Sequence, residues 1–177
     1  MRAIFVASAT MLVSSFCCAV PVRAQCSIQS VVGKWSYNYS GWYIPAGGTT
    51  PVQVSTQGVF NIDGDGKVTG PGTWAMGAPL AGTPVPAGQM LEFDFVDGAI
   101  QVNSDCTGLL WTMLKFKTLP IPALGPYYGR IIVLPARNEI EGMALRAPGT
   151  EKPMWTYTLK RMSYSPGPVT WLSPPPQ

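Results

Sequence analysis

The 177-residue chain contains no histidine, and this absence limits the chemistry that its side chains can perform. It excludes Ser–His–Asp and Cys–His nucleophilic sites and the zinc motifs that use imidazole ligands. No glycine-rich phosphate-binding motif opens a helix, and no cofactor is expected. Carboxylates and tyrosine hydroxyls are the groups that remain for proton transfer or for ligand binding.

Aromatic side chains alternate with polar ones in two segments, one early and one late in the chain. Trp35, Tyr37 and Tyr39 occupy every second position of the first segment, and Trp155 and Tyr157 do so in the second. A period of two places the rings of a β-strand on one face. In a small barrel these rings would line an interior that can hold one ligand. Core packing without any ligand is the alternative.

Two charged residues, Glu92 and Arg161, are candidates for polar groups in or near such a cavity. A buried carboxylate could act as a general acid or base, because burial raises its pKa. Glu92 and Asp94 alternate with Phe93 and Phe95, however, and the two phenylalanines are better suited to the core than the two acids. Glu92 is therefore expected on the solvent face. The candidate ligand-binding residues are Trp35, Tyr37, Tyr39, Trp155, Tyr157, Arg161 and Glu92, with Trp74 and Trp111 as further wall residues, and no catalytic residue is assigned.

The sequence Asp-Gly-Asp-Gly at residues 63–66 has two readings, a calcium loop and a hairpin turn. An EF-type loop needs oxygen ligands at its first, third and fifth positions and an acid at its twelfth. Here Lys67 and Trp74 occupy the fifth and twelfth positions. We therefore predict a β-hairpin turn at Asp63–Gly66, where glycine accepts a positive φ, and no metal site.

The first 24 residues predict a secretory signal peptide, and the mature protein is expected to be secreted or periplasmic. Arg2 precedes an uncharged, largely apolar run over residues 3–22, and Val22 and Ala24 occupy the −3 and −1 positions of a cleavage site. A membrane anchor is the alternative, but serines and cysteines lower the hydrophobicity of this run. Cleavage removes two of the 12 basic residues, which leaves the chain nearly neutral against 9 acidic ones. Nucleic acid is therefore not an expected partner.

The same cleavage removes Cys17 and Cys18 and leaves Cys26 and Cys106 as the remaining cysteines. Two cysteines in an exported chain most simply form one disulfide, which would tie the start of the mature chain to its middle. A redox-active pair is the alternative, but the Cys-x-x-Cys spacing is absent.

Residues 25–162 predict one all-β domain, because glycine and proline (19 and 18 residues) interrupt the chain and no long helical period occurs. A proline-rich tail follows at 163–177, and loops are expected at 77–88 and 118–126. The expected strands are 31–44, 52–62, 67–76, 89–96, 109–117, 128–134, 139–146 and 154–162, with 99–102 either continuing the fourth or standing alone. About eight antiparallel strands favour a closed barrel, which leaves no exposed edges; a two-sheet sandwich is the alternative.

Four pieces of the chain carry a family resemblance: CSI at 26–28 with GKWSY at 33–37, GVFNIDGDGKVTG at 58–70, VNSDCTG at 102–108 and EIEG at 139–142. They resemble exported bacterial proteins with the small, calycin-like barrel of allene oxide cyclase and dirigent proteins. The better understood members of that group guide ring closure or radical coupling of small apolar molecules inside the barrel. The matching residues here are turn glycines, turn acids and cysteines, so the resemblance transfers no catalytic residue.

Three functions follow as hypotheses. The first is a barrel that binds a small apolar or aromatic molecule, and the second is a structural or surface protein with a filled core. The third is a cyclase or isomerase that needs no metal and no cofactor and acts through shape, tyrosine hydrogen bonds and a carboxylate. No stable membrane insertion is expected once the signal peptide is removed.

Overall fold

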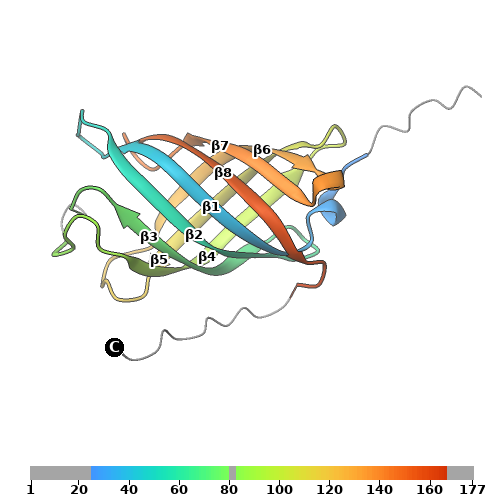
Figure 1. The fold of residues 1–177 in the computed structure, drawn as a ribbon, viewed down its shortest axis with the longest axis horizontal. Helices are drawn as coiled ribbons and strands as arrows, with labels where there is room; N and C mark the ends of the chain where they lie inside the picture. Colours follow the sequence, from blue (N-terminus) through green and yellow to red (C-terminus); the bar gives the residue numbers. More distant parts are fainter. Residues whose placement is uncertain (1–24, 80–82, 167–177) are drawn as a thin grey trace, which may run out of the picture.

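Eight strands follow one another around a single closed antiparallel barrel in the computed structural model, which describes residues 25–79 and 83–166 (Figure 1). Each strand pairs with the next, and the last pairs with the first. The strands are β1 (Gly33–Ile44), β2 (Val52–Ile62), β3 (Val68–Met76), β4 (Leu91–Val102), β5 (Thr107–Phe116), β6 (Leu124–Leu134), β7 (Glu139–Arg146) and β8 (Lys152–Ser163). The predicted all-β barrel is confirmed, and the sandwich alternative is wrong. The predicted signal peptide (1–24) and residues 167–177 of the predicted tail lie outside the described residues.

A bulge explains why the fourth strand looked like two segments in the sequence. Its register shifts between Phe95 and Asp97, so the inward positions change from odd to even residue numbers. Phe93 and Phe95 face the core before the bulge, and Ile100 faces it afterwards. Residues 99–102 therefore continue β4, and the extra residue of the bulge is what breaks the alternation.

The predicted loop at 118–126 is too long, because β6 already begins at Leu124. Proline indicates a loop because it cannot donate a ladder hydrogen bond. Pro126 lies where the pairing of β5 with β6 is irregular, between the pairs Thr112–Tyr127 and Leu114–Leu124. At such a position no backbone donor is required, so proline is tolerated inside the strand.

The N-terminal segment covers one end of the barrel, which we call the η1 end. The 3-10 turn η1 (Ile28–Ser30) and the turn η2 (Pro135–Arg137) both lie there, at the right in Figure 1. Val31 is fully buried, and its carbonyl accepts a hydrogen bond of 2.7 Å from the Trp35 indole nitrogen. The opposite end, the loop end, carries the loops that join β1 to β2, β3 to β4, β5 to β6 and β7 to β8.

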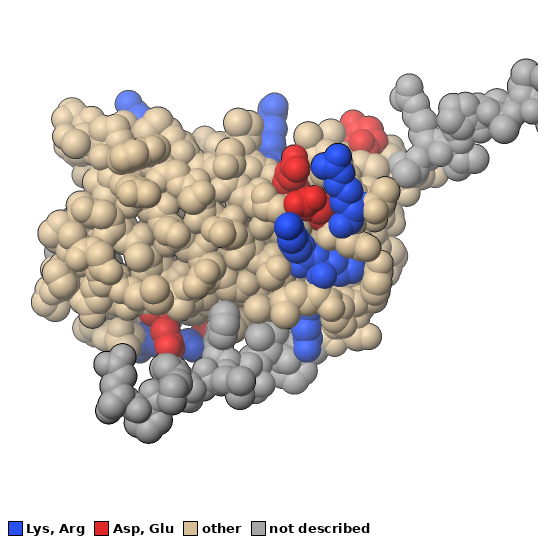
Figure 2. Space-filling model, viewed as in Figure 1, with Lys and Arg blue, Asp and Glu red and all other residues tan. Residues whose placement is uncertain are grey.

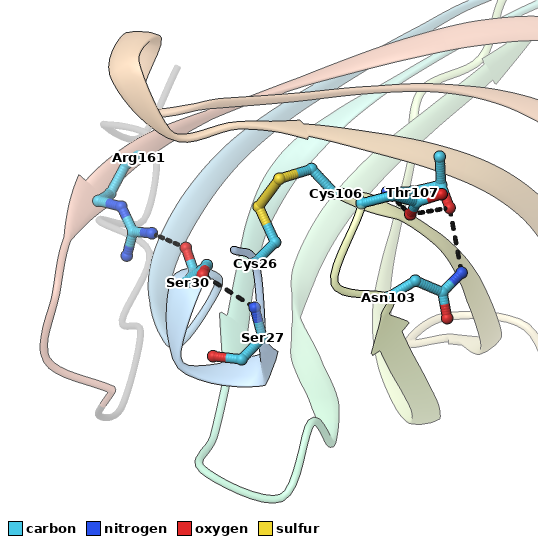
Figure 3. The surroundings of a disulfide bond; sticks show 8 residues. Cys26, Ser27, Ser30, Asn103, Cys106, Thr107 and Arg161 are labelled. Atoms are coloured by element: carbon cyan, nitrogen blue, oxygen red, sulfur yellow. Dashed lines mark hydrogen bonds between the residues drawn. A yellow bond between two sulfur atoms is a disulfide. The ribbon is translucent and has the colours of Figure 1, made fainter. Parts of the chain in front are cut away.

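The predicted disulfide between Cys26 and Cys106 is confirmed and holds this segment in place (Figure 3). It joins residues 80 positions apart, and the Cys26 amide also donates to the Ser104 carbonyl at 3.3 Å. The turn around Cys106 is ordered by Asp105, whose carboxylate accepts hydrogen bonds from the hydroxyl and amide of Thr107. These bonds lower the pKa of Asp105.

Asp63 orders the hairpin turn between β2 and β3 in a similar way. Its side-chain oxygen accepts the amides of Asp65 at 3.0 Å and Lys67 at 2.9 Å. The predicted hairpin is confirmed, and the Asp63 carboxylate is occupied by the turn. Within residues 25–79 and 83–166, no group of three or more cysteine, aspartate or glutamate side chains is arranged to hold a metal ion.

Charged side chains are unevenly distributed over the face formed by β1, β2 and β8. Figure 2 shows them gathered near the η1 end, while most of the remaining surface in this view is uncharged. The outward positions of β1 at Ser36, Asn38 and Ser40 carry small uncharged polar groups. Alternation therefore gives this strand an aromatic inner face, while its outer face carries Lys34 near the η1 end, neutral polar groups in the middle and the half-exposed Trp42 near the loop end.

Replacing Cys26 and Cys106 together by serine is expected to lower the free energy of unfolding by about 4–5 kcal/mol. This is the chain-entropy value for a cross-link over 80 residues. Urea unfolding followed by tryptophan fluorescence measures the loss. Reduction should bring the wild-type protein to the same midpoint and leave the double variant unchanged, whereas equal stability of the two oxidised proteins would contradict the prediction.

Candidate binding site

An interior cavity of about 50 Å³ lies inside the barrel, and all eight strands contribute to its wall. Because a water molecule needs roughly 10–15 Å³ of such space, the cavity holds about three to five water-sized groups. Its wall is aromatic and aliphatic apart from a few hydroxyls. The lining residues are Tyr39, Val54, Thr56, Trp74, Phe93, Phe95, Leu110, Thr112, Leu114, Tyr127, Tyr128, Gly129, Ala144, Trp155 and Tyr157.

Small residues on the inner faces of β6 and β7 make room for this cavity. The Tyr157 ring lies flat across Gly142 to reach Gly129, and its hydroxyl donates to the Arg130 carbonyl at 3.2 Å. A Cβ added at Gly142 would lie 2.3 Å from this ring, and one at Gly129 would lie 2.2 Å from its hydroxyl. The ring therefore covers the wall instead of crossing the interior.

Tyr37 makes the same kind of contact on the other side of the barrel. Its hydroxyl would lie 2.6 Å from a Cβ at Gly58 and 1.9 Å from one at Gly72. Tyr39 lies between the two tyrosines, with ring centroids 5.0 Å from Tyr37 and 4.8 Å from Tyr157. These three rings thus form a row of contacts that runs from the cavity wall to the core nearer the η1 end.

The cavity brings together three of the predicted ligand-binding residues, Tyr39, Trp155 and Tyr157, and also includes Trp74. Trp35 and Tyr37 are buried, but they pack in the core nearer η1 and do not line the cavity. Alternation could not separate these two groups, because inward residues of one strand share a face whatever their depth in the barrel.

Three other candidates lie away from the cavity. Glu92 is on the outer surface, with its side chain 60% exposed and 3.8 Å from Lys117, in agreement with the expectation that it faces solvent. Trp111 also faces outward, since it alternates with the buried Leu110 and Thr112. Neither can contribute to an interior site.

Arg161 lies at the η1 end, where it holds the N-terminal segment. Its guanidinium donates to the carbonyls of Ser30 and Val32, the latter at 2.6 Å, and stacks 4.2 Å from the centre of the Trp35 ring. Figure 3 shows the contact with Ser30 beside the disulfide. Arg161 is therefore placed as a structural cation and not as a cavity residue.

The sequence reasoning missed Glu151, a carboxylate at the loop end that does not line the cavity but interacts electrostatically with the lining residue Tyr127. The Tyr43 hydroxyl donates to its Oε1 at 3.1 Å, while its Oε2 is buried and has no hydrogen-bond partner among the described residues. Trp155 and Tyr127 both belong to the cavity wall, and their ring centroids lie 6.1 Å apart. The ring centroids of Trp155 and Tyr43 lie 6.3 Å apart. One signal was available: Glu151 is the one acidic residue in the four loops of this end.

Burial sets the protonation states around the cavity. It raises the pKa of Glu151, an effect that the Tyr43 hydrogen bond partly offsets. It also raises the pKa of Tyr39, Tyr127 and Tyr157, because each phenolate would lose hydration. These tyrosines remain neutral hydrogen-bonding groups at physiological pH, so Glu151 is the group near the wall that can exchange a proton.

Comparisons of the chain with protein-family models, with curated proteins and with solved structures found no match. The resemblance to allene oxide cyclase and dirigent proteins therefore remains a prediction beyond the small eight-stranded antiparallel barrel itself. Among the described residues, no helix has the length and apolar character needed to cross a membrane.

Replacing Gly142 by alanine is expected to push the Tyr157 ring away from β7 and into the cavity. Overpacking of this kind costs about 1–3 kcal/mol of unfolding free energy. Urea unfolding measures this cost, and a crystal structure of the variant shows the ring position. Gly64→Ala is the control, since nothing lies within 4 Å of its added Cβ. Unchanged stability of Gly142→Ala with the ring in place would refute the packing argument.

Glu151→Gln is expected to change how stability depends on pH. Glutamine keeps an oxygen that accepts from Tyr43 but carries no charge. Because burial raises the pKa of Glu151 above its ordinary value of 4.5, the folded protein holds this proton more tightly than the unfolded chain. Wild-type stability should thus fall, relative to Glu151→Gln, as the pH rises from about 4 through the raised pKa. Urea unfolding across this range, with the exposed Glu92→Gln as control, measures the difference; a difference independent of pH would argue against it.

Proposed function

We propose that the barrel binds one small apolar or aromatic molecule in its interior cavity. The observation that supports this most is a cavity walled by aromatic and aliphatic side chains with a few hydroxyls. Small-molecule sites have this composition, because apolar walls provide affinity and a few polar groups fix orientation. A volume of about 50 Å³ holds a group of about three to five heavy atoms, so a six-membered ring enters only if side chains of the wall move outward.

The leader-like start of the chain and the disulfide support a location outside the cytoplasm. Disulfides persist in oxidising compartments, and Cys26 pairs with Cys106 directly after the predicted cleavage site. We accordingly propose that the protein meets its ligand in the periplasm or after secretion.

A cofactor-independent cyclase or isomerase is the second candidate, and Glu151 is the observation that favours it. A partly buried carboxyl beside neutral tyrosine hydroxyls can transfer a proton while the cavity wall holds the substrate in a reactive shape. Chemical change of a bound molecule, abolished in Glu151→Gln, would favour this enzyme over a simple binding protein.

Filling the cavity tests the binding proposal directly. Ala144→Leu places extra methyl groups in the cavity, whereas Ala75→Leu makes the same change on the outer face of β3, opposite Ser55. Toluene is expected to raise the thermal midpoint of the wild type and of Ala75→Leu, because a ligand that binds the folded state stabilises it. Ala144→Leu should lose this shift.

Native mass spectrometry of gently purified protein provides a second measurement for the same proposal. A small molecule present at about one per chain would support binding. No bound molecule, together with no toluene shift in any of the three proteins, would contradict it and favour a structural protein with a filled core.

A further inference from the structure

A carboxylate at the loop end of the barrel, outside the lining of the cavity but in electrostatic contact with the lining residue Tyr127, lacks a counter-charge. Glu151 carries one oxygen bonded to the Tyr43 hydroxyl and a second, buried oxygen with no partner in the described part of the chain. A buried acceptor without a partner costs free energy, and a charged one costs more. Such an atom can accept a hydrogen bond from water or from a ligand.

No basic side chain of residues 25–79 and 83–166 supplies a donor to this atom. The ion pairs found there join Lys117 to Glu92 at 3.8 Å and to Asp94 at 3.5 Å, both on the outer surface. Arg161, the cation held by buried contacts, is occupied at the η1 end by the carbonyls of Ser30 and Val32. The negative charge of Glu151 is thus not compensated within the described fold.

A chain of aromatic rings leads from this carboxylate to the cavity wall. The Tyr43 hydroxyl donates a hydrogen bond to it. The ring centroid of Trp155 lies 6.3 Å from that of Tyr43, and the ring centroid of Tyr127 lies 6.1 Å from that of Trp155. Glu151 also raises the pKa of Tyr127, after burial itself, so its charge is felt at the cavity wall. Ring faces beside a carboxylate form a favourable environment for an ammonium group, which gains cation–π attraction and a charge-assisted hydrogen bond.

We propose that Glu151, with Tyr43, Tyr127 and Trp155, binds the ammonium group of a small aromatic or apolar amine whose hydrophobic part occupies the interior cavity. This proposal rests on the proposed binding function and adds the class of ligand. The ammonium donates to Glu151 Oε2, and the tyrosine hydroxyls remain neutral. Anionic ligands such as carboxylates are disfavoured at this end, because Glu151 would repel them.

Three probes of similar shape separate the contributions. Toluene provides the ring alone, benzyl alcohol adds a neutral donor, and benzylamine adds a cation. Binding is measured calorimetrically at pH 7 to the full chain. Benzylamine is expected to bind the wild type about tenfold or more tightly than benzyl alcohol. Glu151→Gln should lose this preference and still bind toluene.

A control variant makes the result specific. Glu92→Gln removes an exposed carboxylate that lies outside the proposed site and should keep the amine preference. If Glu151→Gln fails to fold, acidification of the wild type replaces it. The preference should then disappear as Glu151 takes up a proton, because Tyr43 and Tyr127, the other titratable groups facing it, stay protonated.

Each outcome has a distinct meaning. Equal affinities for benzylamine and benzyl alcohol would overturn the amine proposal, and so would an amine preference that is unchanged in Glu151→Gln. If toluene still binds in either case, the proposed binding function stands. Failure of all three probes to bind the folded wild type would overturn both proposals.

Discussion

The contact of tyrosine rings with glycines of neighbouring strands shapes the interior of this barrel, and the contact of Tyr157 does so at the cavity itself. Tyr157 lies across Gly142 and Gly129, and Tyr37 lies against Gly58 and Gly72. A ring that lies along the wall fills the volume that side chains of those strands would have occupied, and leaves the axis free. The cavity therefore depends on the absence of Cβ atoms beneath the rings, in the interior of strands where glycine otherwise weakens the sheet.

The two ends of the barrel then differ in what fills them. At the η1 end, the disulfide, Val31 and the Arg161 contacts hold the N-terminal segment over the core. At the loop end, the four loops contain one acidic residue, Glu151, next to a cavity lined by aromatic rings. Because the η1 end is tied by covalent and charged contacts, we assign the entry of the proposed ligand to the loop end.

The chemistry available inside follows from burial. Phenolates are disfavoured in an apolar interior, so the tyrosines act as neutral donors and acceptors. Glu151 is partly exposed and keeps the ability to exchange a proton. A neutral aromatic cavity with a single anionic group beside its wall is the basis for proposing a ligand that is hydrophobic over most of its surface and carries one cationic group.

Most strands, the barrel, the hairpin at Asp63 and the pairing of Cys26 with Cys106 could be predicted from the sequence, because alternation, turn residues and cysteine count are local or compositional signals. Depth along the barrel could not be predicted in this way: Trp35 and Tyr39 share one face of β1, yet of these two Tyr39 alone lines the cavity. The tertiary structure also placed Glu151 against Tyr43, 108 positions away, through the pairing of β1 with β8. Contacts of this kind depend on strand register and on bulges, and those are fixed by packing across the whole barrel and not by neighbouring residues.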